Sequence, residues 1–335
     1  MKQKKLMVYG ATGYTGAMVA KHAYEIGLSL ILGGRDNNQE ALNKLGQQLN
    51  TEVRCFTLDD EILVREQLSD VFVIINAAGP FENTAKVLMK AAIAQGVHYL
   101  DFSAEIDTYK LALDLNEDAI HSNVMLMPGS GGSVAMLGCL AGHAIAKIDN
   151  PTHIRIALLV SGSMSQGSIK SANQSIVPDT MQLIDGKLVA RTGMETSLFD
   201  FGHGYGELVA FPATLPDLLA IFKATGVPNI DTYVYISDGK FPSGTSDNQV
   251  NGPSEREREV NRYRASVEVT GLNRDKSLFL LDTVNGYTFT AIAAATAAKR
   301  VIEGNIIAGY QTPLSVFGKG FVETIADTKI MDISM

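Results

Sequence analysis

The chain has 335 residues, of which 46% are hydrophobic and 19% are charged, and its formal net charge at pH 7 is -8. A globular chain of this length can bury a full core, and the length favours about two domains. The acidic balance gives no electrostatic reason to expect nucleic acid or an anionic membrane as a partner.

The sequence also argues against membrane, secreted and metal-binding proteins. The longest apolar run, residues 134–148, is interrupted by His143 and Lys147 and is too short to span a bilayer. The basic N-terminus leads directly into a predicted strand, without the apolar region of a cleavable signal. The histidines are scattered singly and the two cysteines are isolated, so we expect no metal site. We therefore expect a cytoplasmic protein without a membrane partner.

Strand and helix patterns alternate over the first 130 residues. Strands are predicted at residues 6–9, 29–32, 53–58, 71–75, 99–103 and 124–127, and helices at 17–26, 39–49, 61–68, 84–95 and 107–121. Crossovers of this length connect parallel strands and place helices on both faces of the sheet. We therefore predict an α/β fold, with a Rossmann-type doubly wound parallel sheet over residues 1–130.

A glycine-rich segment lies between the first predicted strand and the first predicted helix. It consists of Gly10, Ala11, Thr12, Gly13, Tyr14, Thr15 and Gly16. Glycine permits unusual dihedral angles and a close approach of a ligand, and the N–H groups at the start of a helix attract phosphate. The segment predicts a site for the pyrophosphate of a dinucleotide; the alternative is a turn that binds nothing.

The second predicted strand is followed by Gly34, Arg35 and Asp36. In dinucleotide-binding folds an acidic residue at this place binds the ribose 2′-hydroxyl of NAD. A glycine leaves room there, and the guanidinium of Arg35 can pair with a 2′-phosphate. We therefore expect NADP rather than NAD. In the competing interpretation Asp36 binds the ribose and Arg35 is a solvated surface charge.

The ends of the third and fourth predicted strands add further candidates. Asp59 is placed to accept a hydrogen bond from the adenine amino group, although an acid there can equally cap the next helix. Small residues follow the fourth strand and would let the cofactor pass close over the backbone. They are Asn76, Ala77, Ala78 and Gly79, before Pro80. The alternative is an ordinary turn between strand and helix.

The second half of the chain changes character. Residues 181–190 predict a hairpin about Asp185-Gly186, and further strand-like segments favour a mostly antiparallel sheet. We predict a second α+β domain over residues 131–287 and expect residues 288–335 to pack back on the first domain. Residues 237–260 lack periodicity and are interpreted as a mobile lid or as a surface excursion.

Several segments of the chain resemble those of a known family, the saccharopine dehydrogenase-like NADP-binding oxidoreductases, whose relatives include enoyl reductases. The resemblance rests on residues 10–16, 34–35, 75–81, 96–105, 309–313 and 317–318. It implies a two-domain NADP(H)-dependent reductase or dehydrogenase with a small-molecule substrate. Relatives often carry an acidic motif after the sixth strand, where this chain has residues 128–133 with no acid. A catalytic role is therefore not carried over to that loop.

Hydride transfer also needs a group that donates a proton to the substrate. No tyrosine is followed by lysine four residues later, so the relay of short-chain dehydrogenases is absent. Asp101 and Glu105, at the end of the fifth predicted strand, are the candidate donors, and the alternative is that they cap the next helix. His203 and Tyr205 are further candidates in the second domain.

The bond that is reduced stays open between C=N, C=O and C=C. An amino-acid-type substrate would need a cationic clamp for its carboxylate, and the candidates are Arg155, Arg191, Arg262 and Arg264. The alternative function is that of a non-catalytic NADP-binding sensor or partner protein. Enzymes of this size commonly form two-fold dimers, so a homodimer is expected on that ground alone.

Overall fold

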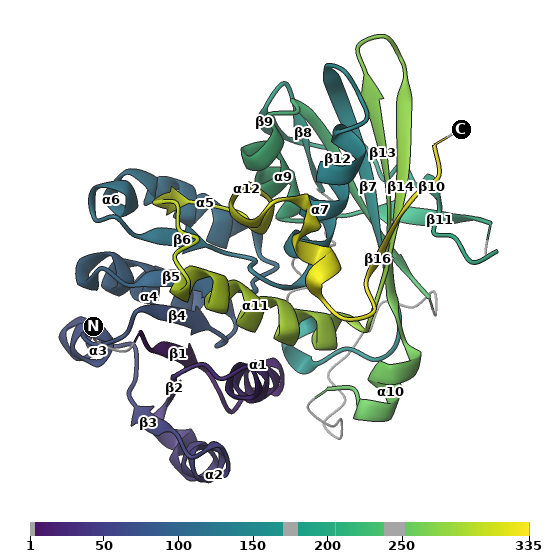
Figure 1. The fold of residues 1–335 in the computed structure, drawn as a ribbon. Coiled ribbons are helices and arrows are strands. Elements are labelled where there is room, and N and C mark those ends of the chain that lie inside the picture. The colour runs from purple at the N-terminus through teal and green to yellow at the C-terminus, as the bar shows by residue number, and fades with distance from the viewer. Residues whose placement is uncertain (1–3, 170–179, 205, 238–251, 335) are drawn as a thin grey trace. The chain divides into compact units, whose positions relative to one another are not determined.

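The structure is a computed structural model that describes residues 4–169, 180–204, 206–237 and 252–334 (Figure 1). The chain divides into two compact units. Unit 1 runs to Ser103 and adds Asp107–Gly132 and Thr290–Thr312. Unit 2 comprises Ala104–Ile106, Ser133–Phe289 and the chain from Pro313 onward.

Unit 1 contains a seven-stranded sheet in which all strands are parallel. Its strands are β1 (Leu6–Tyr9), β2 (Leu30–Gly34), β3 (Glu52–Cys55), β4 (Val73–Asn76), β5 (His98–Asp101), β6 (Met125–Met127) and β15 (Gly309–Tyr310). The order is β15-β6-β5-β4-β1-β2-β3. The direction of winding therefore reverses between β1 and β4, and open α/β sheets bind ligands at the carboxyl ends of strands at such a point.

The helices of unit 1 cover both faces of this sheet, and Figure 1 shows α3 and α4 on one side and α1 and α11 on the other. They are α1 (Tyr14–Glu25), α2 (Gln39–Leu49), α3 (Glu61–Leu68), α4 (Phe81–Gln95), α5 (Ile106–Asp114), α6 (Asn116–His121) and α11 (Gly286–Ile302), which enters from unit 2. Strands β1 and β4 are buried at every position, as a parallel sheet covered on both faces requires. The predicted doubly wound fold is confirmed.

Local sequence signals account for the ends of several of these helices. Gly96 ends α4 with φ 69°, as expected for a glycine in a left-handed C-cap. The helix expected over residues 107–121 is instead two helices that meet at Leu115, whose ψ of 4° departs from helical geometry. The side chain of Asn116, the first residue of α6, accepts a hydrogen bond from Tyr310 N at 2.9 Å. The break therefore lets α6 hold the added strand β15.

Unit 2 is built on a nine-stranded mixed sheet. Its strands are β7 (Pro151–Val160), β8 (Met181–Ile184), β9 (Lys187–Ala190), β10 (Ser197–Asp200), β11 (Glu207–Pro212), β12 (Asn229–Ile236), β13 (Tyr263–Gly271), β14 (Lys276–Thr283) and β16 (Lys329–Asp332). The main path is β10-β11-β12-β7-β13-β14-β16, and β8 joins β12 to β9. Only β7 and β12 pair in parallel among the described strands of this sheet. The expected, mostly antiparallel α+β domain is confirmed.

The hairpin predicted about Asp185-Gly186 connects β8 to β9, and both turn residues have positive φ, 48° and 74°. The helices of unit 2 are α7 (Gly132–Ile145), α9 (Asp217–Thr225), α10 (Glu255–Val260) and α12 (Pro313–Phe317). Helix α10 lies inside the stretch expected to be irregular. Residues 238–251 of that stretch, on which the lid interpretation depends, lie outside the described residues.

The C-terminal part of the chain differs from the expectation. Residues 288–335 were predicted to return to the first domain, but only Thr290–Thr312 belongs to unit 1. From Pro313 onward the chain belongs to unit 2, because β16 pairs antiparallel with β14 and places Ile330 opposite Leu281. The boundary expected after residue 130 lies between Gly132 and Ser133.

Candidate functional site

The glycine-rich segment joins β1 to α1 at the carboxyl edge of the unit 1 sheet. Gly10 has φ 87°, and its N–H donates to Gly33 O at 2.8 Å. A Cβ on Gly10 would lie 2.7 Å from Ala78 N, and one on Gly16 would lie 2.2 Å from Gly10 O. These two glycines are therefore required by the packing of the β1, β2 and β4 ends against one another.

Gly13 plays a different part, because it is the N-cap of α1 and is exposed. A Cβ there would meet only Gly10 O at 3.2 Å and Ala77 O at 3.9 Å within 4 Å. Among the described residues no side chain caps α1, and its first turn has no acidic residue. Helix α3, in contrast, is capped by Asp60 and begins with Glu61. The start of α1 therefore fits an anionic group such as a pyrophosphate.

The end of β2 presents a cation beside this segment. Gly34 is buried, and its carbonyl accepts a hydrogen bond from Phe56 N at 2.9 Å. Arg35 and Asp36 are both exposed. Within the described ranges the guanidinium of Arg35 makes no hydrogen bond or ion pair. The arrangement fits a phosphate on the adenosine ribose, and it leaves the competing role of Asp36 open.

The two acids after β3 have separate roles. Asp60 Oδ1 accepts hydrogen bonds from Ile62 N at 2.9 Å and Leu63 N at 3.1 Å, so Asp60 is the helix cap. Asp59 is exposed and does not take that role. The expected contact of Asp59 with adenine stays a prediction.

Asn76 supports the turn after β4 from within the protein. Its side chain is fully buried, donates to Thr84 Oγ1 at 3.0 Å and to Tyr99 OH at 3.1 Å, and accepts from Ala78 N at 3.0 Å. These bonds fix the backbone of Ala77 and Ala78 against Gly10. The Asn76 amide thus points inward and shapes the turn, and the expected passage of the cofactor over the backbone of this turn stays a prediction.

Asp101 continues this buried network in unit 1. Oδ2 accepts from Tyr99 OH, and Oδ1 accepts from Ser103 N, Ser103 Oγ and Gly129 N, all at 2.9 Å. Complete burial raises the pKa of Asp101 to about 6, although these hydrogen bonds act in the opposite direction. The carboxyl connects β5 to the loop after β6 and so positions that loop, while its role as proton donor stays a prediction.

Glu105 is not brought together with Asp101 in one unit, because Ala104–Ile106 belongs to unit 2. Its side chain is 9% exposed, and Oε2 accepts from Ala104 N at 2.9 Å. The carboxylate thus binds the backbone immediately before α5. A role of Glu105 as proton donor stays a prediction.

The four candidate clamp arginines are engaged by acids of the unit 2 sheet. Their ion pairs are Arg155–Glu268 at 3.1 Å, Arg191–Asp231 at 2.7 Å, and Arg262 and Arg264 with Asp282 at 2.8 and 3.7 Å. His203 Nε2 also contacts Asp282 Oδ2 at 3.0 Å. The guanidinium groups are therefore components of ion pairs within the sheet, and no preformed carboxylate clamp follows from them. Tyr205 lies outside the described residues.

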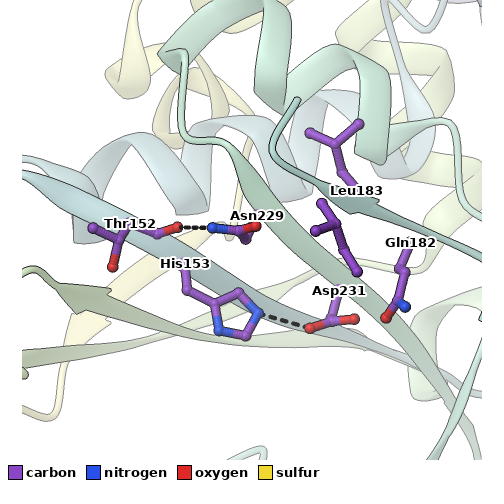
Figure 2. Close-up of a pocket in the computed structure, with 7 residues that line it drawn as sticks. Thr152, His153, Gln182, Leu183, Asn229 and Asp231 are labelled. Atoms are coloured by element: carbon purple, nitrogen blue, oxygen red, sulfur yellow. Dashed lines mark hydrogen bonds and ion pairs between the residues drawn. The ribbon is translucent and has the colours of Figure 1, made fainter. Parts of the chain in front are cut away.

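A pocket of about 280 Å³ lies within unit 2, on strands β7, β8 and β12 (Figure 2). Its lining residues are Thr152, His153, Gln182, Leu183, Ile184, Asn229 and Asp231. Figure 2 shows His153 beside Asp231, with Nε2 and Oδ2 2.7 Å apart. Burial alone would raise the pKa of Asp231, but His153 and the charge of Arg191 hold it below its usual range. None of the predicted site residues lines this pocket.

The sequence analysis did not single out one buried carboxyl group of unit 2. Asp217, the first residue of α9, is fully buried, and its Oδ2 accepts from Ser133 Oγ at 3.2 Å. Oδ1 has no hydrogen-bond partner among the residues that the structure describes. An acid at a helix start reads as a surface cap in the sequence, so only the structure distinguishes this one. The searched residues hold no group of three or more His, Cys, Asp or Glu side chains that could bind a metal ion.

Comparisons with known proteins agree with this geometry. Residues 6–127 match the family model described as the saccharopine dehydrogenase NADP binding domain. Apo saccharopine dehydrogenase (L-Glu forming) from Saccharomyces cerevisiae superposes with a TM-score of 0.65 at 12% identity, over 99% of this chain and 100% of that chain. Homospermidine synthase from Legionella pneumophila, solved with NAD, superposes with a TM-score of 0.69 at 10% identity, over 100% of this chain and 92% of that chain. At these identities the structural likeness shows the fold.

Curated relatives match a smaller part of the chain. A lipid droplet localized protein of Caenorhabditis elegans is 30% identical over 116 residues, which are 31% of this chain and 27% of the relative. Sulfoacetaldehyde reductase 2 of Chromohalobacter salexigens is 30% identical over 141 residues, 41% of this chain and 55% of the relative. No helix among the described residues is long and apolar enough to cross a membrane. The expected resemblance to the saccharopine dehydrogenase family is confirmed for the nucleotide-binding unit.

Proposed function

We propose that the protein is an NADP(H)-dependent oxidoreductase, because residues 6–127 match a saccharopine dehydrogenase NADP binding domain. It would transfer hydride between nicotinamide C4 and a C=N, C=O or C=C bond of a small molecule. The observation that carries the proposal is the start of α1, which among the described residues has neither cap nor acid and lies at the switch point of the sheet. A pyrophosphate supplies the negative charge that such a helix start favours.

The same unit supports NADP over NAD. Gly34 stands where NAD-binding folds carry an acid for the ribose 2′-hydroxyl. Arg35 follows it, exposed and without an ion pair in the described part of the chain. A guanidinium of this kind forms charge-assisted hydrogen bonds with a phosphate, so we assign the 2′-phosphate to Arg35.

Different residues of the chain then hold different parts of the cofactor, which supplies the hydride. The N–H groups at the start of α1 hold the pyrophosphate, and Arg35 fixes the adenosine end. The turn at Ala77 and Ala78, held by Asn76, carries two small side chains after the end of β4. The cofactor is thereby oriented along the carboxyl edge of the sheet.

Substitution of Arg35 by alanine tests the cofactor preference. Because charge-assisted hydrogen bonds contribute roughly 1.5–3 kcal/mol, Arg35→Ala should weaken NADPH binding by about tenfold to a hundredfold and leave NADH binding unchanged. The Kd values are measured by calorimetry. Arg65→Ala, which removes an exposed arginine from α3 in the same unit, is the matched control. An equal loss for both cofactors would exclude the phosphate contact.

A measurement of turnover distinguishes the proposed oxidoreductase from a non-catalytic NADP sensor. The oxidation of NADPH is followed by its absorbance with aldehydes, with 2-oxo acids plus amines, and with enoyl thioesters. An oxidoreductase consumes NADPH with at least one of these classes. Tight NADPH binding without consumption in any of them would favour the sensor.

A further inference from the structure

A chain of hydrogen bonds connects the ends of β4 and β5 inside unit 1. Asn76 and Asp101 are partners in the register of these two strands, and Tyr99 precedes Asp101 by two positions, so the three side chains lie on one face of the sheet. Asn76 Nδ2 lies 3.1 Å from Tyr99 OH, which lies 2.9 Å from Asp101 Oδ2. All three residues are completely buried, and hydrogen bonds in such an interior depend strongly on the match of donors to acceptors.

Two backbone groups fix the direction of every hydrogen bond in this chain. Ala78 N can only donate, so the oxygen of the Asn76 amide faces it and Nδ2 points the other way. Ala78 O can only accept, so Thr84 Oγ1 donates to it at 2.7 Å and accepts from Asn76 Nδ2. The second hydrogen of Nδ2 goes to the Tyr99 hydroxyl, which in turn donates to Asp101. The chain therefore runs in one direction and ends at an acceptor.

The ionised form of Asp101 matches this direction, and the protonated form does not. Oδ1 accepts from the backbone N–H groups of Ser103 and Gly129, which cannot reverse. A proton would therefore be bound at Oδ2, which faces the Tyr99 hydroxyl. Tyr99 would then meet a donor from both Asp101 and Asn76, and its own hydrogen would displace one of them. Protonation of Asp101 thus disturbs the hydrogen bonds of Tyr99 and, through Tyr99, those of Asn76.

Asn76 passes this disturbance to the turn that packs on the glycine-rich segment. Its side-chain oxygen holds Ala78 N, and a Cβ on Gly10 would lie 2.7 Å from the same nitrogen. Ala77 N donates to Tyr9 O, at the end of β1, at 2.7 Å. Closely packed segments transmit strain to one another, so a displacement of this turn reaches Gly10 and the segment that leads into α1.

We propose that Tyr99 is a positioning residue for the cofactor, through which the ionised form of Asp101 holds the turn after β4 in the arrangement that binds NADPH. This inference rests on the proposed function. Binding and ionisation are then linked in both directions, because the carboxylate favours NADPH and NADPH favours the carboxylate. Neither Tyr99 nor Asp101 has to contact the cofactor for this linkage.

The titration of Asp101 falls in an accessible pH range, since burial raises its pKa to about 6 against the hydrogen bonds that it accepts. The neighbouring strands β4 and β6, and residues 128–131 after β6, contain no titratable side chain. The titratable residues of the other packed elements are Glu82, Lys86 and Lys90 of α4, which are exposed, His98 and Tyr99 of β5 itself, and Tyr109 of α5, whose hydroxyl donates to Ser103 O at 2.9 Å.

Carbon-13 NMR of the aspartate carboxyl groups of the full chain follows this ionisation directly. The Asp101 signal is identified by its absence in Asp101→Asn, because Asp217, whose pKa burial raises to about 7, titrates in the same range. Saturating NADPH should lower the Asp101 midpoint by about one pH unit. The negative charge of the cofactor acting through space would raise the midpoint instead, so the sign of the displacement identifies the linkage.

Tyr99→Phe keeps the buried ring and removes the hydroxyl that connects Asp101 to Asn76. In this variant the midpoint of the free protein should rise, because the carboxylate loses one donor, and NADPH should no longer lower it. Tyr310→Phe, which removes another completely buried tyrosine hydroxyl of the same sheet, is the matched control and should behave like wild type.

Calorimetric titration of NADPH gives a second readout. The fall in affinity from about pH 8 to about pH 5.5 should be about threefold larger in wild type than in Tyr99→Phe, the change that a midpoint displaced by about one pH unit produces. The 2′-phosphate of the cofactor titrates in the same range, but it contributes equally to both proteins. A merely structural role of Tyr99 would weaken binding by the same factor at every pH.

Equal Asp101 midpoints with and without NADPH, or the same displacement in wild type and Tyr99→Phe, would overturn the inference while leaving the proposed function intact. Failure of NADPH to bind would overturn the proposed function, and the inference with it. Should Asp101→Asn fail to fold, the Asp101 signal is identified by its raised midpoint in Tyr99→Phe. Should Tyr99→Phe fail to fold, the wild-type midpoints with and without NADPH decide alone.

Discussion

Individual side chains at the strand ends of unit 1 mostly serve the backbone. Asn76 binds the turn that contains Ala78, and Asp101 binds the loops that contain Ser103 and Gly129. Polar residues after parallel strands read in the sequence as ligand contacts, because that edge is where ligands bind. The contacts of these two side chains with the backbone follow from their burial, and burial depends on tertiary packing that residue type alone does not reveal.

The positioning role of Asp101 leads to a prediction about stability. Asp101→Ala removes the acceptor of four buried donors, including Ser103 N and Gly129 N, and should lower the free energy of unfolding by about 3 kcal/mol or more. Urea denaturation measures the change. Asp114→Ala, at an exposed position of α5, should stay within about 0.5 kcal/mol of wild type. A loss below about 1 kcal/mol in Asp101→Ala would contradict the role.

At the scale of elements, unit 1 was predicted more completely than unit 2. Alternating periodicity and the glycine-rich segment indicate parallel strands in βαβ units, because each signal is local. In the sheet of unit 2, β12 begins at Asn229 and pairs in parallel with β7. Pairing between distant strands depends on tertiary contacts, so neither this parallel pair nor β16 could be derived from sequence.

The start of α1 gives a prediction at this scale. Gly13 has φ -68° and ψ 160°, angles that a capping aspartate can adopt. Gly13→Asp should therefore maintain or increase thermal stability, while its carboxylate repels the pyrophosphate and weakens NADPH binding about tenfold or more. Gly13→Ala is the uncharged control. Calorimetric titration and thermal unfolding measure both effects.

In the expected result, Gly13→Asp loses NADPH affinity but keeps its thermal stability. The substitution would then act on binding and not on folding. Undiminished NADPH affinity in Gly13→Asp would exclude a pyrophosphate at the start of α1. A loss of affinity of the same size in Gly13→Ala would instead assign the effect to the added Cβ, which lies 3.2 Å from Gly10 O.

At the scale of the whole molecule, the chain passes between its two units several times. Helix α11 begins in unit 2 and continues in unit 1 from Thr290, and the chain returns to unit 2 at Pro313. The sequence predicted a second α+β domain but assigned the C-terminus to the wrong unit, because β16 is short and pairs with a strand about fifty residues earlier. Expectations of a homodimer and of a cytoplasmic location stay predictions.

The central claim is that unit 1 binds a nicotinamide dinucleotide phosphate. Calorimetric titration of NADPH and NADH into the full chain tests it most directly. We predict NADPH binding with a Kd on the order of micromolar, about -8 kcal/mol, and NADH binding at least about tenfold weaker. Binding of neither cofactor would contradict the account, because the glycine-rich segment would then be only a turn between a strand and a helix.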